Sequence, residues 1–384
     1  MKAIVNAKVI TMACGVVENG TIVMDKGKIV SLESGGVVPE GATVLDVEGR
    51  IVTPGFIDAH VHAGICEEGV PGAMNAVNED TSAVTPHVRA IDGINPSDEG
   101  FRNAVEAGIT CMQILPGSAN IIGGTGVIVK PVGNIVDRMV IRAHSGMKAA
   151  LGENPVNWQG GKGRFPSTRM GNAACMRKAI GDAFDYRAKK EQAEKKGEHF
   201  TLDQGMENFL PVLDGTVPMR IHCHRADDIC TAIRICDEFG LRYTLEHCTE
   251  GHLIADYLAE KKVKAAVGPT ATSKTKVEVR DKGWHTLLAL KEAGVPFCLI
   301  TDHPVIPIEN LPVAAALAVR AGLDEQTALK ALTVEAASHL ELEDRLGSIE
   351  SGKDADLVVW SGDPLDVRSR PVQVFVDGQP QLDW

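Results

Sequence analysis

The sequence contains no apolar run that approaches the ~20 residues needed to cross a membrane. Its first ten residues, MKAIVNAKVI, are mixed and strand-like, without the apolar centre of a signal peptide. Positive charge is also scarce, because 51 acidic residues outnumber 39 basic ones and leave a net charge of −12. These absences argue against an anionic membrane or a nucleic acid as a partner, since both attract basic surfaces.

Paired cysteines are missing as well. The nine cysteines are an odd number, they are scattered singly, and no C-x-x-C pair occurs. Several of them, such as Cys111 and Cys298, lie in apolar, strand-like segments. We therefore expect reduced, mostly buried thiols in a cytoplasmic protein, and no disulfide framework.

The composition is that of an ordinary globular protein, with 44% apolar and 23% charged residues. The chain has 384 residues, whereas a (β/α)8 barrel alone takes about 250 residues. The length therefore accommodates one barrel and one small accessory domain. The acidic surface and a barrel architecture permit a homo-oligomer, either a dimer or a larger ring.

The two ends of the chain share a strand-and-turn character. Segments that alternate as short strands are 21–24, 28–32, 43–47, 356–360 and 372–376. The simplest arrangement joins residues 1–53 and 346–384 into one small β-sandwich. The barrel would then be inserted between them, at residues 54–345.

The middle of the chain alternates apolar strands with helical stretches, which is the pattern of a parallel α/β fold. The expected strands are 108–115, 217–222, 242–247, 264–268 and 297–302. The expected helices are 97–107, 227–239, 251–260, 284–293 and 310–321. Residues 152–216 do not fit a minimal barrel, so we interpret them as a long insertion between two strands.

The strongest signal of chemistry is the segment PGFIDAHVH, which contains His60 and ends at His62. Two histidines separated by one residue on a strand point to the same side. Such a pair of histidines often occurs by chance and is not by itself evidence of a metal site. However, His222, His247 and Asp302 each lie at the end of a later predicted strand, where TIM barrels place their catalytic groups.

Four imidazoles and one carboxylate at strand ends predict a site for one or two divalent metal ions. Neutral imidazole and carboxylate suit Zn²⁺ first, with Mn²⁺ or Fe²⁺ as alternatives. The competing interpretation is a set of core histidines with satisfied hydrogen bonds and an aspartate that caps a helix. That interpretation requires four independent coincidences.

These segments resemble the amidohydrolase superfamily over essentially the whole chain. The run 52–62 is similar to the first-strand signature of that family, and 353–359 (KDADLVV) is similar to the segment that re-enters the β-sandwich. The segments 221–228 (IHCHRADD) and 300–304 (ITDHP) most resemble the imidazolonepropionase-like branch. The resemblance implies a (β/α)8 TIM-type barrel with a small β-sandwich, and an enzyme that hydrolyses carbon–nitrogen bonds.

The resemblance also implies roles for the predicted ligands. His60 and His62 would bind the more buried metal together with Asp302. His222 and His247 would bind a second metal, or His222 would join a single-metal site. Asp302 would also accept the proton of the water that the metal activates and pass it to the leaving nitrogen.

In two-metal members of the family, a fourth-strand carboxylate supplied by Glu or by a carboxylated Lys bridges the ions. Glu153 is the preferred candidate, because it lies just past an apolar strand. Lys148 is nearer the start of that strand, and Lys130 is assigned to the preceding one. If none of them is a ligand, the site holds one metal. Alternatively, Glu153 is a loop carboxylate that binds backbone amides or caps a helix.

Three further residues are candidates for binding the substrate. His224 points away from the predicted ligands if its strand continues, but a turn would bring it inward. His303 directly follows Asp302. Arg169 precedes a predicted helix and would pair with a substrate carboxylate, or else form a surface salt bridge. For both histidines the alternative is a structural role.

We therefore expect metal-activated water to cleave the C–N bond of an open or cyclic amide in a small molecule, with Asp302 as general base and acid. One alternative is a dipeptidase or carboxypeptidase-like activity on N-acyl or X-amino-acid substrates, and another is deamination of a ring. A non-enzymatic assembly protein is the last alternative, and the complete ligand set argues against it.

Overall fold

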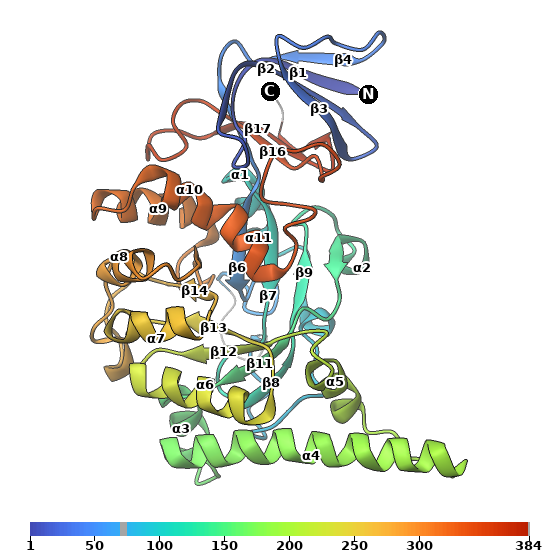
Figure 1. Ribbon diagram of the computed structural model, residues 1–384, viewed down its shortest axis with the longest axis vertical. Helices are drawn as coiled ribbons and strands as arrows, with labels where there is room; N and C mark the ends of the chain where they lie inside the picture. Colours follow the sequence, from blue (N-terminus) through green and yellow to red (C-terminus); the bar gives the residue numbers. More distant parts are fainter. Residues whose placement is uncertain (70–74, 383–384) are drawn as a thin grey trace.

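The computed structural model describes residues 1–69 and 75–382. A β-rich part lies at one end of the molecule and a mixed α/β part makes up the rest (Figure 1). Across these two described ranges, no helix combines the length and the apolar character of a membrane span. All nine cysteines are free thiols, while a cytoplasmic location stays a prediction.

The β-rich part brings both ends of the chain into one sheet. Its strands are β1 (Lys2–Ile10), β2 (Val16–Asp25), β3 (Lys28–Ser34), β4 (Thr43–Asp46), β5 (Ile51–Pro54), β16 (Leu357–Trp360), β17 (Pro371–Val376) and β18 (Gln379–Pro380). Their order is β18-β17-β16-β5-β1-β2-β3, with β4 beside β1. The two ends meet where β16 pairs antiparallel with β5, Val358 opposite Thr53. The division of the chain into a β-sandwich and a barrel stays a prediction.

Apolar residues that alternate along these strands explain why the sheet forms. Ile4 and Val9 of β1, Ile22 of β2 and Leu357 of β16 are fully buried in one cluster. In β16 the alternate residues Val358 and Trp360 are also buried, and they belong to the core cluster of the α/β part. The sheet therefore has a core of its own, supplied by both chain ends.

The α/β part contains two further sheets. A four-stranded sheet has the order β10-β9-β7-β6, and a six-stranded sheet has the order β15-β14-β13-β12-β11-β8. The bounds are β6 (Phe56–Val61), β7 (Ile109–Ile114), β8 (Ile122–Thr125), β9 (Val127–Val129), β10 (Val140–Arg142), β11 (Met147–Ala150), β12 (Met219–Cys223), β13 (Tyr243–His247), β14 (Ala265–Val267) and β15 (Phe297–Leu299). Strands β11 to β15 run parallel to one another, as do β6 and β7.

The two sheets of the α/β part meet beside β6 and β15. The amide of His62 donates to the carbonyl of His303 at 2.8 Å across this seam. The strands on both sides are buried on both faces, which explains their continuous apolar runs. The mixed α/β architecture is thus confirmed, whereas the described strands do not pair around a closed barrel.

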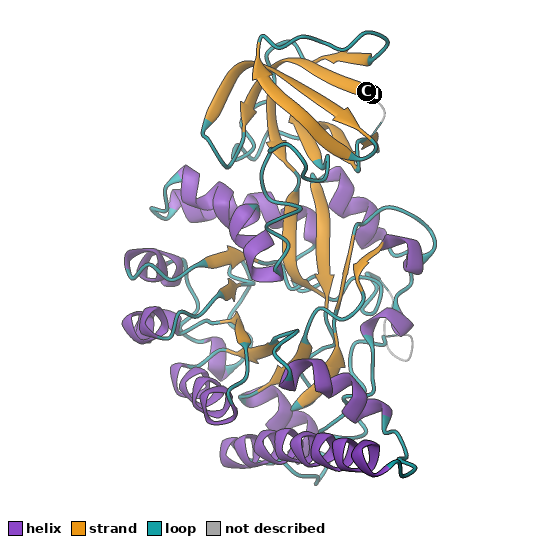
Figure 2. Cartoon of the chain, turned by 45° about the vertical axis from the view of Figure 1, so that its right-hand side comes forward, coloured by secondary structure: helices purple, strands orange, loops and turns teal. Residues whose placement is uncertain are grey.

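Helices line the outer side of these parallel strands (Figure 2). They are α1 (Glu99–Glu106), α2 (Val136–Met139), α6 (Ala226–Phe239), α7 (Ala255–Glu260), α8 (His285–Glu292), α9 (Leu311–Arg320), α10 (Glu325–Leu332) and α11 (Val334–Leu340). Short 3₁₀ turns are η2 (Ala90–Gly93), η3 (Gly251–Ile254), η4 (Val277–Val279) and η5 (Ile308–Asn310). Helix α6 ends at Gly240, whose φ of 66° is a left-handed conformation that glycine adopts without steric cost.

The expected insertion is helical. It contains α3 (Glu153–Gly160), α4 (Arg169–Lys196) and α5 (Gln204–Leu213), and α4 runs along the end of the molecule farthest from the β-rich sheet (Figure 1). Thr168 caps α4 by accepting a hydrogen bond from the amide of Gly171. The last turns of α4, at residues 189–196, carry mostly exposed charged side chains.

A group of ion pairs around the buried Lys130, Asp354 and Asp356 joins the β-rich sheet to the α/β part. Lys130 Nζ, directly after β9, lies 3.0 Å from Asp354 Oδ2, 2.9 Å from Asp356 Oδ1 and 2.6 Å from Asp377 Oδ1. Arg345 also reaches Asp354, at 2.7 Å. We call Lys130, Arg345, Asp354, Asp356 and Asp377 the junction cluster.

Candidate metal centre

Five of the predicted ligands meet at one end of the parallel strands. His60 lies on β6 with His62 just beyond it, His222 lies on β12, His247 ends β13, and Asp302 follows β15. The ligand atoms of His60, His247 and Asp302 lie within 4.8 Å of one another, and so do those of His222, His224 and His247. The centre thus consists of two overlapping triads that share His247.

Backbone strain marks two of these positions. His247 has a φ of 74° and Asp302 a φ of 55°, both in the left-handed region that L-residues other than glycine rarely adopt. Each residue stands where a strand ends, so the strained turn redirects a side chain that the regular pleat would aim elsewhere. Strain of this kind is concentrated at functional sites.

Outer hydrogen bonds fix the orientation of three imidazoles. His62 Nδ1 lies 2.7 Å from the carbonyl of Leu115, and His247 Nδ1 lies 2.8 Å from the carbonyl of Gly268. A carbonyl oxygen only accepts, so these Nδ1 atoms donate and each neutral ring keeps a lone pair on Nε2. His60 Nδ1 similarly faces Glu246 Oε2 at 2.9 Å. Metal-binding histidines are held in this way.

The Nε2 atoms converge on the carboxylate of Asp302. Asp302 Oδ1 lies 3.2 Å from His62 Nε2 and 3.6 Å from His60 Nε2. This oxygen is buried and accepts no hydrogen bond. Acceptor atoms that face one another without a proton between them repel, and a cation placed among them removes the repulsion.

Electrostatics hold these groups in the forms that bind metal. Burial lowers the pKa of His60 to about 3, and burial also lowers the pKa of His222 and of His247, so the rings stay neutral. Burial alone would raise the pKa of Asp302, but its interactions with His247, His62 and His60 outweigh burial and hold that pKa below its usual range. Metal ligands must be deprotonated in this manner.

Lys148 reaches the centre, and Glu153 does not. Lys148 is buried on β11 with its Nζ 3.0 Å from His60 Nε2, and burial lowers the pKa of its ammonium to about 8. Glu153 opens α3, where its carboxylate accepts from the amide of Glu278 at 3.3 Å and from Asn157 Nδ2 at 3.3 Å. The structure therefore favours Lys148 over Glu153 as the bridging candidate, because the Glu153 carboxylate binds a backbone amide at a helix start.

The remaining bridging candidate lies elsewhere in the molecule. Lys130 follows β9 and belongs to the junction cluster, where three carboxylates surround its ammonium. Its side chain therefore takes no part in the metal centre.

The three substrate-binding candidates have different surroundings. His224 turns inward, with its ring 4.7 Å from that of His222 and its Nδ1 2.7 Å from Thr249 Oγ1. His303 is fully buried, and its Nδ1 accepts from the amide of Ile308 at 3.1 Å. Arg169 forms ion pairs with the carboxylates of two acids at the start of α6, Asp227 at 2.5 Å and Asp228 at 2.9 Å.

Sequence reasoning missed the groups behind His60. Glu246 accepts from Thr244 Oγ1 at 2.8 Å and lies between two histidines, 2.9 Å from His60 Nδ1 and 3.1 Å from His339 Nε2. The available signal was a charged residue in an otherwise apolar strand, immediately before His247. Such a residue is rarely buried unless it is paired.

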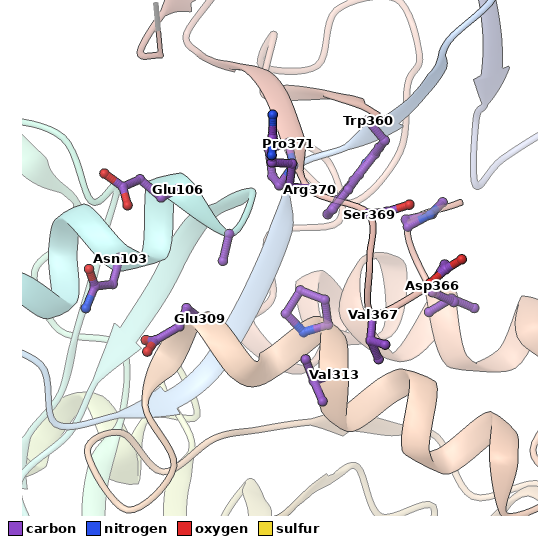
Figure 3. A pocket seen from close by; sticks show the side chains of 14 residues that line it. Asn103, Glu106, Glu309, Val313, Trp360, Asp366, Val367, Ser369, Arg370 and Pro371 are labelled. Carbon is purple, nitrogen blue, oxygen red and sulfur yellow. The ribbon is translucent and has the colours of Figure 1, made fainter. Parts of the chain in front are cut away.

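A pocket of about 320 Å³ opens over the centre. Its described lining includes His62, His222, His224 and Asp302, with Lys282 on the wall. A second pocket, of about 430 Å³, lies between α1, α9 and the connection after β16, beside Glu106, Glu309 and Trp360 (Figure 3). No histidine is among the described residues that line this second pocket, so the chemistry belongs to the first.

Comparison with known proteins gives consistent results. Residues 212–381 match the model of the Amidohydrolase family. The amidohydrolase tasK of Hapsidospora irregularis is 30% identical over 95% of this chain, which spans 40% of that protein's length. The imidazolonepropionase of Rhizorhabdus wittichii is 26% identical over 92% of each chain.

Solved structures extend the comparison to the whole fold. A crystal structure of an amidohydrolase from Thermotoga maritima superposes with a TM-score of 0.97, at 43% identity over 100% of both chains. A prolidase complexed with N-methylphosphonate-L-proline superposes with a TM-score of 0.63 at 19% identity, a likeness of fold alone. These neighbours imply a TIM-barrel-type domain.

Proposed function

The chain belongs to the amidohydrolase family and is a metal-dependent hydrolase of carbon–nitrogen bonds, and on this premise we propose which of its residues perform the reaction. His60, His62, His222, His247 and Asp302 hold the metal, and Asp302 moves the proton. The observation that carries this proposal is the convergence of neutral Nε2 atoms on an ionised carboxylate that accepts no hydrogen bond.

The donor set fits a divalent ion, with Zn²⁺ as the first choice and Mn²⁺ or Fe²⁺ as alternatives. When bound, such an ion lowers the pKa of water towards ~7 and polarises the carbonyl under attack. The two overlapping triads favour two ions. In that case Lys148 would be the bridging ligand once its neutral amine has added CO₂ and lost a proton to give the carbamate, because its amine lies at the centre and burial favours the neutral, reactive form.

Asp302 performs the proton transfers in this proposal. Its Oδ1 faces the ligands and the pocket, and no other carboxylate is among the described residues that line the pocket. The carboxylate accepts a proton from the attacking water and donates it to the leaving nitrogen. A positioned carboxylate that carries out both transfers contributes about 10²–10⁴ in rate.

The remaining groups hold the ligands in place and limit the substrate. Glu246 fixes the ring of His60, and the carbonyl of Gly268 fixes that of His247. A pocket of about 320 Å³ accommodates a small molecule. We also keep the composite β-sandwich, the closed barrel and the cytoplasmic location as proposals, the first two supported by the likeness to amidohydrolase structures.

A substrate screen tests the proposed function. The Zn²⁺-, Mn²⁺- and Fe²⁺-loaded enzyme is assayed with cyclic amides, N-acyl amino acids and dipeptides, and both new amino groups and free ammonia are measured. New amino groups indicate amide hydrolysis, whereas ammonia indicates deamination. Turnover should depend on metal and on His222. Metal-independent turnover, or none with any compound, would count against the proposal.

A further inference from the structure

A cluster of lysines forms one wall of the catalytic pocket. The segment between β14 and α8 contains Lys274, Lys276 and Lys282, and the last two line the pocket together with His222 and Asp302. Lys282 also borders a narrow recess beside His247. Lys282 therefore lines the same cavity as the proposed metal ligands.

The charge of Lys282 has no acidic partner among the residues that the structure describes. Its Nζ donates to Thr272 Oγ1 and, at 3.0 Å, to the carbonyl of Ser273, and both of these acceptors are neutral. An ammonium has three N–H donors, so one remains available. Burial and the charges of Lys274 and Lys276 lower the pKa of Lys282, and an anion beside it would reverse that shift.

The acids closest in sequence are paired with other groups. Asp281, the neighbour of Lys282, lies 3.0 Å from His252 Nε2. Glu278 lies 2.5 Å from Lys276 Nζ. The only carboxylate in the described lining of the pocket, Asp302, faces His60 and His62. Lys276 is thus neutralised within the chain, while Lys282 leaves an unmatched positive charge on the wall.

We propose that Lys282 binds a carboxylate of the substrate, so that the enzyme cleaves N-acyl amino acids or dipeptides whose scissile C–N bond lies between the metal centre and a free carboxylate. This inference rests on the proposed function, and it names the substrate class. It gives Lys282 the role that the sequence suggested for Arg169, whose guanidinium is already paired with Asp227 and Asp228.

The inference predicts that binding and hydrolysis differ between a charged ligand and a neutral ligand of the same shape. The probes are N-acetyl derivatives of alanine, leucine, methionine, phenylalanine and proline, each as the free acid and as the primary amide. We expect the metal-loaded enzyme to bind and hydrolyse the best acid in preference to its amide. A hydrogen bond between charged groups is worth about 10- to 100-fold in affinity.

Three variants separate the charge of Lys282 from its size and from the charge of the loop. Lys282→Met should raise KM for the acids by about 10- to 100-fold, with kcat and the KM for the amides changed little. Lys282→Arg should restore most of the preference. Lys274→Met removes an equal charge from an exposed position outside the lining, and should leave the preference intact.

Calorimetric binding of the same probes keeps the test independent of turnover. Acids that bind no more tightly than amides, or a Lys282→Met variant that weakens both equally, would overturn the inference. If binding of acids depends on Lys282 but neither these compounds nor the wider screen is hydrolysed, the carboxylate site at Lys282 stands, whereas the proposed hydrolysis fails. The two failures are therefore distinguishable.

Discussion

The molecule buries two groups of charged and titratable side chains, and they differ in how their charges are matched. In the junction cluster, the ammonium of Lys130 contacts three carboxylates, and Arg345 reaches one of them. In the metal centre, acceptor atoms of His62 and Asp302 face one another, and His60 Nε2 faces both Asp302 and the Lys148 amine. A charge matched within the chain stabilises the fold, whereas unmatched acceptors indicate a place for a cation.

Two aspartates make the contrast sharper. Asp356 Oδ2 and Asp302 Oδ1 are both buried without a hydrogen-bond partner. Burial raises the pKa of Asp356 to about 6, whereas the surrounding imidazoles hold the pKa of Asp302 below its usual range. The junction aspartate thus accepts a proton below about pH 6, whereas the aspartate of the centre keeps the charge that a metal requires.

Asp302→Asn should have the largest effect on catalysis. Asparagine keeps the size and can coordinate weakly through its carbonyl oxygen, but it cannot accept the proton. Turnover per bound metal should fall by about 10²–10⁴, measured by steady-state assay together with elemental analysis. If metal and activity fall in parallel and excess metal restores the rate, Asp302 only anchors the metal.

Lys130→Met should affect stability and leave the chemistry unchanged. It leaves three carboxylates without their buried cation, so the free energy of unfolding should fall by about 3–5 kcal/mol, measured by urea denaturation. Lys8→Met, in an exposed pair with Glu18, should change it by less than about 0.5 kcal/mol.

Activity per folded molecule shows whether a substitution in the junction cluster affects the metal centre. Lys130→Met should keep the metal content and turnover of the native enzyme. A loss of bound metal in this variant, at a denaturant concentration where it is still folded, would mean that the junction and the centre are coupled and that the contrast is wrong.

Glu246→Gln should have a smaller effect, on metal affinity. Its carboxylate orients the ring of His60 at 2.9 Å, and loss of such an outer partner typically weakens metal binding by about 10- to 100-fold. Competition with a chelator of known affinity measures this change, with Lys130→Met as the control. Unchanged affinity in Glu246→Gln would show that His60 is positioned without it, or is not a ligand.

The smallest expected effect is on the pH dependence of stability. The pKa of Asp356 is raised from 3.8 to about 6 in the folded chain, so between these values the folded state binds the proton more tightly than the unfolded state. Its contribution to stability is therefore complete below about pH 4 and is lost as pH rises towards 6. Burial raises the pKa of Asp354, but its hydrogen bond to Lys28 and the charge of Lys130 outweigh burial and lower that pKa to about 2. The contribution of Asp354 to stability therefore changes below the window between pH 4 and pH 6.

Asp356→Asn should remove that slope. Unfolding of the two chains should be compared at intervals between pH 4 and pH 6, with the exposed Asp137→Asn as the control. The wild type should lose stability relative to Asp356→Asn as pH rises, by no more than about 1.4 kcal/mol per unit of pKa shift. Parallel stability curves for the two chains would contradict the assignment.

Much of the fold follows from local sequence pattern. The expected helix 227–239 is α6 (Ala226–Phe239), and the expected strand 242–247 is β13 (Tyr243–His247), because long periodic segments bounded by glycine are specified locally. His60 and His62 could be proposed together because one pleat aims both to the same side. Strands of three residues, such as β15 (Phe297–Leu299), carry too little pattern to fix their ends.

Other features depend on distant residues or single turns. The surroundings of Glu153 depend on one turn, where Gly152 adopts a φ of 96° and ends the apolar run, so the strand residue facing the centre is Lys148. The partners of Lys130 are more than 200 residues away in sequence. No residue close to Arg169 in the sequence indicates that its guanidinium forms ion pairs with Asp227 and Asp228.

The most direct test of the central claim is the metal content of the chain purified without chelators. Elemental analysis should find about one to two equivalents of divalent metal per chain in the wild type and in Lys130→Met. A His222→Ala, His247→Ala double variant, which removes the His247 shared by both triads and a second ligand of one triad, should retain little or none. A wild-type chain that is metal-free and fully active, or a double variant with the full metal content, would contradict the account.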